Sequence, residues 1–142
     1  MKFRTIKFTF LTYLKHYLTI PLVFGMLIPI VFLDVCLEIY HRISFPILKI
    51  PVVKRSRYIR IDRYKLPYLR WYDKIFCAYC EYGNGLLHYA SIIAGETEKY
   101  WCGIKHEEAN DFIPPRHHKN FVIYGDKDAL EKQYPRPPRK NT

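Results

Sequence analysis

The sequence predicts a mainly α-helical protein, in which one N-terminal transmembrane or re-entrant helix precedes a small helical-hairpin Cys/His domain with minor β structure. Two observations predict this fold class. An apolar and uncharged stretch near the N-terminus is long enough to enter a bilayer. Apolar residues of the second half recur at helical spacing between Gly and Pro residues, which are typical of turns.

Changes in composition along the chain divide it into five segments. These are a basic, aromatic N-terminal flank (1–16), a membrane segment (17–43), a juxtamembrane basic connector (44–66), a Cys/His helical domain (67–133) and a disordered tail (134–142). Roughly 90 residues follow position 50, and so short a chain gains from an additional staple such as a metal ion.

The membrane segment carries no charged residue from Tyr17 to Leu33. It lacks the small-residue cleavage pattern of a signal peptide, so we expect the protein to retain it. Pro21, Gly25 and Pro29 interrupt the segment, and proline removes a helical hydrogen bond. A kinked single span is the favoured interpretation, and a re-entrant wedge is the alternative. Asp34 and Glu38, near its far end, are expected at the level of the lipid headgroups.

Positive charge predicts both the orientation and a lipid partner. The chain has 23 Lys and Arg against 13 acidic residues. Six cations, from Arg42 to Arg60, flank the C-terminal end of the membrane segment and four flank its N-terminal end, which favours an inner-membrane protein with a cytoplasmic C-terminal domain. The basic cluster after the segment is expected to contact anionic headgroups, at about 1 kcal/mol per cation. A solvated face is the simpler alternative. The expected lipid-contacting residues are Lys54, Arg55, Arg57 and Arg60.

Helices dominate the expected structure after the connector. Pro67 is placed to open a first helix, and Gly83-Asn84-Gly85 to end it with a turn. Apolar spacing predicts a second helix to about Trp101, which completes the hairpin. A short strand is expected over 121–124, and a last short helix after the N-cap residue Asp126.

Three cysteines and one histidine have the spacing of a metal site, Cys77-x2-Cys80-x21-Cys102-x3-His106. Thiolates and imidazoles are the ligands of a closed tetrahedral zinc site. A cytoplasmic location keeps thiols reduced. The pattern therefore predicts a zinc site, with iron or an iron–sulfur cluster as the alternative cofactor.

A continuous second helix is an obstacle to one shared site, because it separates the two ligand pairs by its length. A break at 95–97 removes the obstacle. Otherwise the pairs meet across an antiparallel dimer, or Cys102 and His106 recruit His117 or His118. Separate sites, a redox dithiol and inert thiols also stay open.

The sequence shows no pair of carboxylates suited to acid–base catalysis, and Glu96 and Glu98 are expected to solvate the helix surface. The interpretation is a non-catalytic, membrane-anchored zinc-binding accessory or interaction protein, with a larger membrane complex or a homodimer as partner. A thiol–disulfide or iron-based redox protein at the membrane is one alternative. A membrane-associated nucleic-acid binder is another, and it is disfavoured because a membrane interface explains the many tyrosines equally well.

About a third of the chain resembles a group of small uncharacterised bacterial membrane-anchored proteins. The resembling stretches are Ile61–Arg63, Leu66–Leu69, Cys77–Leu86 and Thr97–His106, with the pattern CxYCxYxNG…YWCxIKH. The resemblance implies an N-terminal membrane segment and a Cys/His domain, with no mechanism attached. The sequence departs from the group at Gly103, where proline is expected, and at Gly95, where a better helix former is expected.

Overall fold

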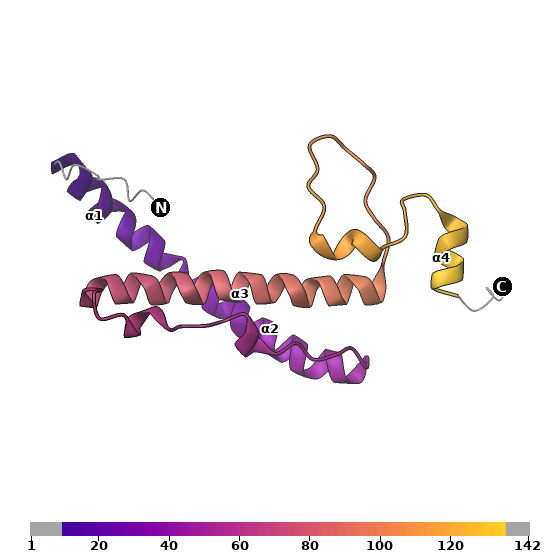
Figure 1. The fold of residues 1–142 in the computed structure, drawn as a ribbon, viewed down its shortest axis with the longest axis horizontal. Helices are drawn as coiled ribbons and strands as arrows, with labels where there is room; N and C mark the ends of the chain where they lie inside the picture. Colours follow the sequence, from indigo (N-terminus) through magenta and orange to yellow (C-terminus); the bar gives the residue numbers. More distant parts are fainter. Residues whose placement is uncertain (1–9, 136–142) are drawn as a thin grey trace. The chain divides into compact units, whose positions relative to one another are not determined.

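The computed structural model describes residues 10–135, and within them it is mainly helical (Figure 1). Outside this range lie most of the predicted tail and three of the charged residues of the predicted N-terminal flank, Lys2, Arg4 and Lys7. The chain forms two compact units, one up to Ala90 (the first unit) and one from Ser91 (the second unit). The elements are α1 (Phe10–Gly25), α2 (Leu27–Ile47), the 3-10 helices η1 (Arg55–Arg57) and η2 (Arg63–Lys65), α3 (Trp71–Trp101), the 3-10 helix η3 (Arg116–Asn120), and α4 (Lys127–Gln133).

The prediction of a mainly α fold is confirmed, and β structure is reduced to a single bridge. Over residues 10–135 the structure contains no strand, and Ile104 pairs with Val122 in an isolated parallel bridge. The Val122 N–H donates to the Gly103 carbonyl at 2.9 Å, and the Lys105 N–H donates to the Val122 carbonyl at 2.8 Å. The strand expected over 121–124 is therefore wrong, because only its second residue pairs.

The apolar N-terminal segment forms α1 and α2, which meet at Met26. Pro29 has no N–H to donate to the carbonyl of Gly25, four residues earlier, and α1 ends at Gly25. The interruption thus lies within the proline-flanked stretch where the sequence predicts a kink. By length and composition, residues 17–47 could cross a membrane, and none of the described side chains in their most apolar part is fully buried.

The predicted end of a helix at Gly83–Gly85 is wrong, since α3 continues through it to Trp101. The glycines serve close packing instead of a turn. A Cβ atom on Gly85 would lie 2.9 Å from the carbonyl oxygen of Tyr58 and 3.0 Å from the Cα of Ile59. The backbone of the connector therefore lies directly against α3 at this point, and the missing side chain makes room for it. The predicted hairpin is replaced by one long helix.

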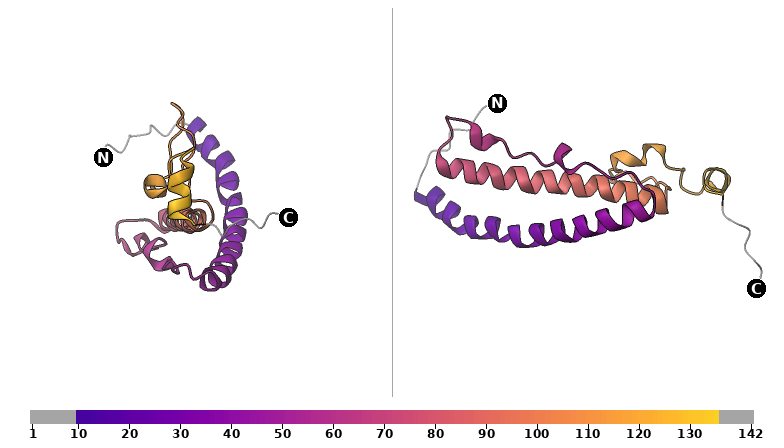
Figure 2. Two further views of the ribbon diagram at one scale, coloured as in Figure 1. Left: turned by 90° about the vertical axis from the view of Figure 1, so that its right-hand side faces the viewer. Right: turned by 90° about the horizontal axis from the view of Figure 1, so that it is seen from below.

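In the first unit, α2 packs against α3 (Figure 2, right), and Asp34 and Glu38 of α2 accept hydrogen bonds from Tyr82 and Tyr89 of α3. The ring of Phe24, near the end of α1, lies 5.5 Å from those of Phe76 and Tyr79 on α3. Farther along the pair, Phe45 and Leu86 are fully buried, and these side chains form the core of the unit.

The second unit starts with the last turns of α3 and continues through the bridge, η3 and α4. Gly103 has a φ of +63°, and its N–H donates to the Glu98 carbonyl at 3.1 Å, as at many helix ends. Proline, which the resemblance led us to expect at 103, has neither this φ nor an N–H. Asp126 caps α4 as predicted, because its carboxylate accepts the Ala129 N–H at 2.9 Å.

Candidate metal centre

Glu98, His117 and His118 bring a carboxylate and two imidazoles together in the second unit. Glu98 projects from the last turn of α3, and the two histidines are neighbours on η3. The Nε2 atom of His117 lies 2.7 Å from Oε2 of Glu98, and that of His118 lies 3.1 Å from Oε1. One ligand atom from each residue falls within 4.8 Å of the other two.

A glycine on α3 makes room for the His117 ring. Gly95 precedes Glu98 by three residues, so the two positions lie on the same face of the helix. A Cβ atom at 95 would lie 2.9 Å from Nδ1 and 3.0 Å from Cγ of His117. Gly95, one of the two positions at which the resemblance led us to expect another residue, is therefore the residue that lets this imidazole approach the helix.

Hydrogen bonding determines the charge of Glu98 and the proton positions facing it. The hydrogen bond from His117 lowers the pKa of Glu98 more than burial raises it, and the bond from His118 lowers it further. An ionised carboxylate can only accept hydrogen bonds, so both Nε2 atoms carry their protons here. A metal ion bound at these atoms would displace those protons.

The arrangement fits a divalent transition metal in its donor types and their spacing. Zinc binds imidazole nitrogen and carboxylate oxygen at about 2.0–2.2 Å, which places neighbouring tetrahedral ligands about 3.3 Å apart. The separations of 2.7 and 3.1 Å between Glu98 oxygens and histidine nitrogens are close to that value. Metal-bound histidine usually donates its other N–H to a partner. That second bond is not formed at His118, because within the described chain its buried Nδ1 atom has no hydrogen-bond partner.

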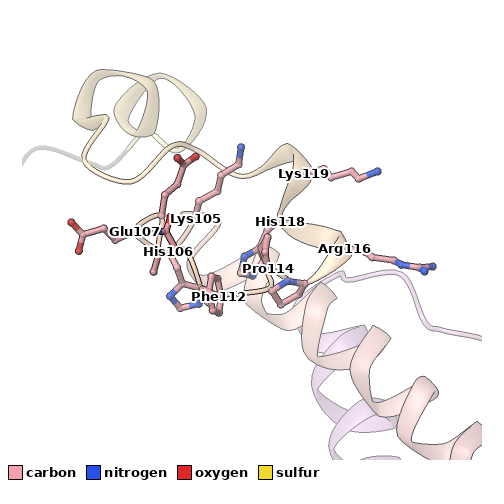
Figure 3. Close-up of a pocket in the computed structure, with 12 residues that line it drawn as sticks. Lys105, His106, Glu107, Phe112, Pro114, Arg116, His118 and Lys119 are labelled. Atoms are coloured by element: carbon pink, nitrogen blue, oxygen red, sulfur yellow. The ribbon is translucent and has the colours of Figure 1, made fainter.

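A hollow of about 720 Å³ adjoins the histidines (Figure 3). His118, which is 3% exposed, and His106 both line it, and their ring centres are 5.4 Å apart. Three cations, Lys105, Arg116 and Lys119, and two carboxylates, Glu107 and Glu108, also line the hollow. His106 is the nearest further imidazole to the cluster.

The sequence-predicted ligands are distributed over both units. Cys77 is half-buried and Cys80 exposed, and both lie on the first-unit part of α3. Cys102 is exposed directly after α3 ends, and His106 follows in the second unit. The helix is unbroken through 95–97, where one shared site required a break. The structure brings His106 next to His118, but Cys102, which the same alternative requires, is outside the group formed by Glu98, His117 and His118. The Cys3His site itself stays a prediction.

Sequence reasoning missed Glu98, which is not merely a solvating group. Its side chain is 32% exposed and is engaged by both histidines. The adjacent pair His117-His118 was one available signal. The glycine one turn before a glutamate, inside an otherwise strong helix, was another.

A second polar cluster lies in the first unit, where Arg55 bridges two carboxylates of α2. Its Nη2 donates to Oδ2 of Asp34 at 2.7 Å, and its Nη1 bonds Asp34 and, at 3.2 Å, Oε1 of Glu38. The Tyr82 hydroxyl donates to Asp34 at 2.7 Å, and the Tyr89 hydroxyl donates to Glu38 at 3.0 Å. The bond to Asp34 raises the pKa of the Arg55 guanidinium. The carboxylates that the sequence placed among headgroups therefore bind protein groups.

The other expected lipid-contacting residues have different surroundings from Arg55. Lys54 and Arg57 are exposed. Arg60 is also exposed and pairs with Asp62 at 2.8 Å. These three cations are accessible to headgroups, and their contact with lipid stays a prediction.

No family model, curated protein or solved structure matches this chain.

Proposed function

We propose that this chain is a membrane-anchored, non-catalytic accessory protein that binds a zinc-type divalent metal through Glu98, His117 and His118. The observation that carries the proposal is the convergence of one carboxylate and two imidazoles within 4.8 Å. Zinc suits this donor set, because it accepts nitrogen and oxygen ligands without a strong geometric preference.

The ligand count is completed from within the second unit. Three protein ligands leave one tetrahedral position, and His106 is the candidate for it because its ring lies 5.4 Å from that of His118. A closed site of four protein ligands stabilises a fold, which is the role we propose. This small unit gains from such a staple, since a structural zinc contributes on the order of 10 kcal/mol of apparent binding energy.

Anchoring rests on the apolar helices α1 and α2, which leave large apolar side chains exposed along their length. We propose the inner membrane as the location, with the second unit in the cytoplasm. The count of six cations after the apolar segment against four before it supports that orientation.

Elemental analysis of the detergent-purified full chain tests the metal proposal. We expect about one zinc per chain in the wild type, and its loss in Glu98→Gln and in His117→Ala. Glu96→Gln is the matched control, since Glu96 lies on the same helix outside the cluster, and it should retain the metal.

Cys77→Ser separates this site from the one that the cysteine spacing predicts. Retention of zinc in Cys77→Ser together with its loss in Glu98→Gln supports the His/Glu centre. Loss in Cys77→Ser with retention in Glu98→Gln would overturn it in favour of the Cys3His site. A metal-free wild type that is fully folded would overturn both.

A further inference from the structure

The polarity of α2 is inverted relative to a helix of a water-soluble protein. Exposed large apolar side chains recur at spacings of three and four residues, which place them on one face. Ile28 is 77% exposed, Phe32 71% and Ile47 73%. We call this face the apolar stripe, and it comprises Ile28, Phe32, Val35, Ile39, Ile43 and Ile47.

Asp34, Glu38 and His41 lie on another face of α2 and are covered by the protein, whereas Arg42 is 74% exposed at the border of the stripe and pairs with Glu38 at 2.7 Å. Asp34 and Glu38 are bonded to Arg55 and to tyrosines of α3. His41 is 2% exposed and bonds to Tyr89. The face with Asp34, Glu38 and His41 is therefore turned toward α3, where its polar groups find hydrogen-bond partners, and the apolar stripe is turned away from the protein.

The charged residues of the connector are held near the middle of α2, because the connector is bonded to α3 and α3 packs against α2. Gly83 of α3 lies against Ile30 of α2, with 3.7 Å between its Cβ position and the Ile30 side chain. Two residues earlier on α3, the Glu81 carboxylate accepts the backbone N–H of Arg63 at 3.2 Å. The connector thus runs along α3 (Figure 2, right). It carries four exposed cations, Arg57, Arg60, Arg63 and Lys65.

An upright α2 would carry these groups into the hydrocarbon core. A charged side chain at the bilayer centre costs at least about 2.5–3.5 kcal/mol, and several would enter together. The described part of α1 is too short to cross the bilayer in place of α2, because only the residues before Phe24, which itself packs against α3, are available. These 14 residues, Phe10–Val23, rise about 21 Å, against a core of about 30 Å, and they include Lys15.

We infer that α2 lies in the plane of the membrane surface, with the apolar stripe embedded in one leaflet and α3 on the aqueous side. The inference rests on the anchoring part of the proposed function and adds that the chain is monotopic. Packed helix axes are about 8–10 Å apart, so α3 lies just above the headgroups in this arrangement and the connector cations that accompany it stay on the aqueous side. The bilayer is the partner of the stripe because its members are large, apolar and exposed, and because the two carboxylates of α2, Asp34 and Glu38, bind groups of the connector and α3.

Depth-dependent fluorescence quenching distinguishes this orientation from a span. In the full chain, with its four cysteines replaced by serine, single cysteines at 28, 35, 39 and 47 would carry a bimane label in vesicles containing phosphatidylglycerol. Lipids brominated at different acyl positions would report the depth of each label. Ser56→Cys, at an exposed connector position, is the aqueous control.

An in-plane helix predicts similar shallow depths at all four stripe positions and no quenching at 56. Residues 28 and 47 are about 28 Å apart along the axis, so an upright helix would place 35 and 39 near the bilayer centre and the other two near opposite surfaces. That profile would overturn the in-plane inference and leave the anchoring intact. Absence of lipid quenching at every position would overturn both.

Infrared dichroism of the unmodified protein in oriented bilayers avoids dependence on the cysteine-free variant. Since α2 and the adjoining α3 dominate the helical signal, an in-plane arrangement places the amide I moment parallel to the membrane. A moment along the membrane normal would contradict the inference.

Discussion

The Nδ1 atom of His41 and the hydroxyl of Tyr89 lie 3.0 Å apart in the core of the first unit. The Val53 N–H donates to Nε2 of His41 at 3.0 Å, so Nε2 is the unprotonated nitrogen and Nδ1 carries the proton. His41 therefore donates to Tyr89, and Tyr89 donates to Glu38 at 3.0 Å. A backbone amide of the connector thus determines the direction of a hydrogen-bond chain that joins α2 to α3.

Tyr89→Phe should destabilise the first unit by about 1–3 kcal/mol. The ring stays in place, but the buried Nδ1–H of His41 loses its acceptor. Chemical unfolding of the full chain in mild detergent measures the change. Tyr68→Phe, at a side chain 75% exposed, should shift the free energy by less than about 0.5 kcal/mol. Equal effects of the two substitutions would contradict the chain described above.

Stability should fall at high pH through Tyr89. Burial, followed by its hydrogen bond to Glu38, raises the pKa of Tyr89 from 10.0 to about 12. The unfolded chain loses this proton from about pH 10 and the folded chain only near 12, so stability is lost as pH rises between these values. The slope contributed by one group is at most about 1.4 kcal/mol per pH unit. Unfolding at stepped pH values should show a shallower loss in Tyr89→Phe, and identical slopes would exclude this role.

Arg55→Ala should cost on the order of 2 kcal/mol or more, because it leaves Asp34 and Glu38 without their shared cation. Arg57→Ala is the matched control from the same 3-10 helix, and its side chain is exposed. The comparison is made by thermal unfolding in detergent. If both variants unfold at the same temperature, the ion pairs of Arg55 with Asp34 and Glu38 contribute nothing measurable to stability.

Gly95→Ala should release metal from the His/Glu centre even though alanine favours a helix by about 1 kcal/mol. The new Cβ would lie 2.9 Å from Nδ1 of His117 and push its ring away from Glu98. Gly83→Ala, on the same helix, meets only an ordinary contact at 3.7 Å and should keep the zinc. Elemental analysis measures the zinc content of both variants. Equal zinc in the two would show that Gly95 has no part in forming the centre.

Reversal of the exposed connector cations tests their contact with anionic lipid. Arg57→Glu combined with Arg60→Glu should weaken partitioning of the full chain from detergent into vesicles containing phosphatidylglycerol, more at low than at high salt. Binding that is unchanged at every salt concentration would assign these arginines to solvation alone.

Local signals in the sequence determined the apolar segment, the mainly helical class and the cap at Asp126. Each depends on residues within one or two helical turns, such as the proline four positions beyond the end of α1. Local signals misled where a residue serves a distant neighbour. Gly85 was interpreted as a turn residue, but its missing side chain accommodates the backbone of Tyr58 and Ile59.

Tertiary structure alone decided the two polar clusters. Asp34 and Tyr82 are 48 residues apart in sequence, and Glu98 and His117 are 19 apart, so no periodicity or spacing relates them. Their approach depends on α3 being continuous and on the connector and η3 folding back against it. The composition and motifs of a sequence show which side chains are available to bind a metal or to form an ion pair. Only packing determines which of them share a position, because burial makes an unpaired charge costly and so selects its partner.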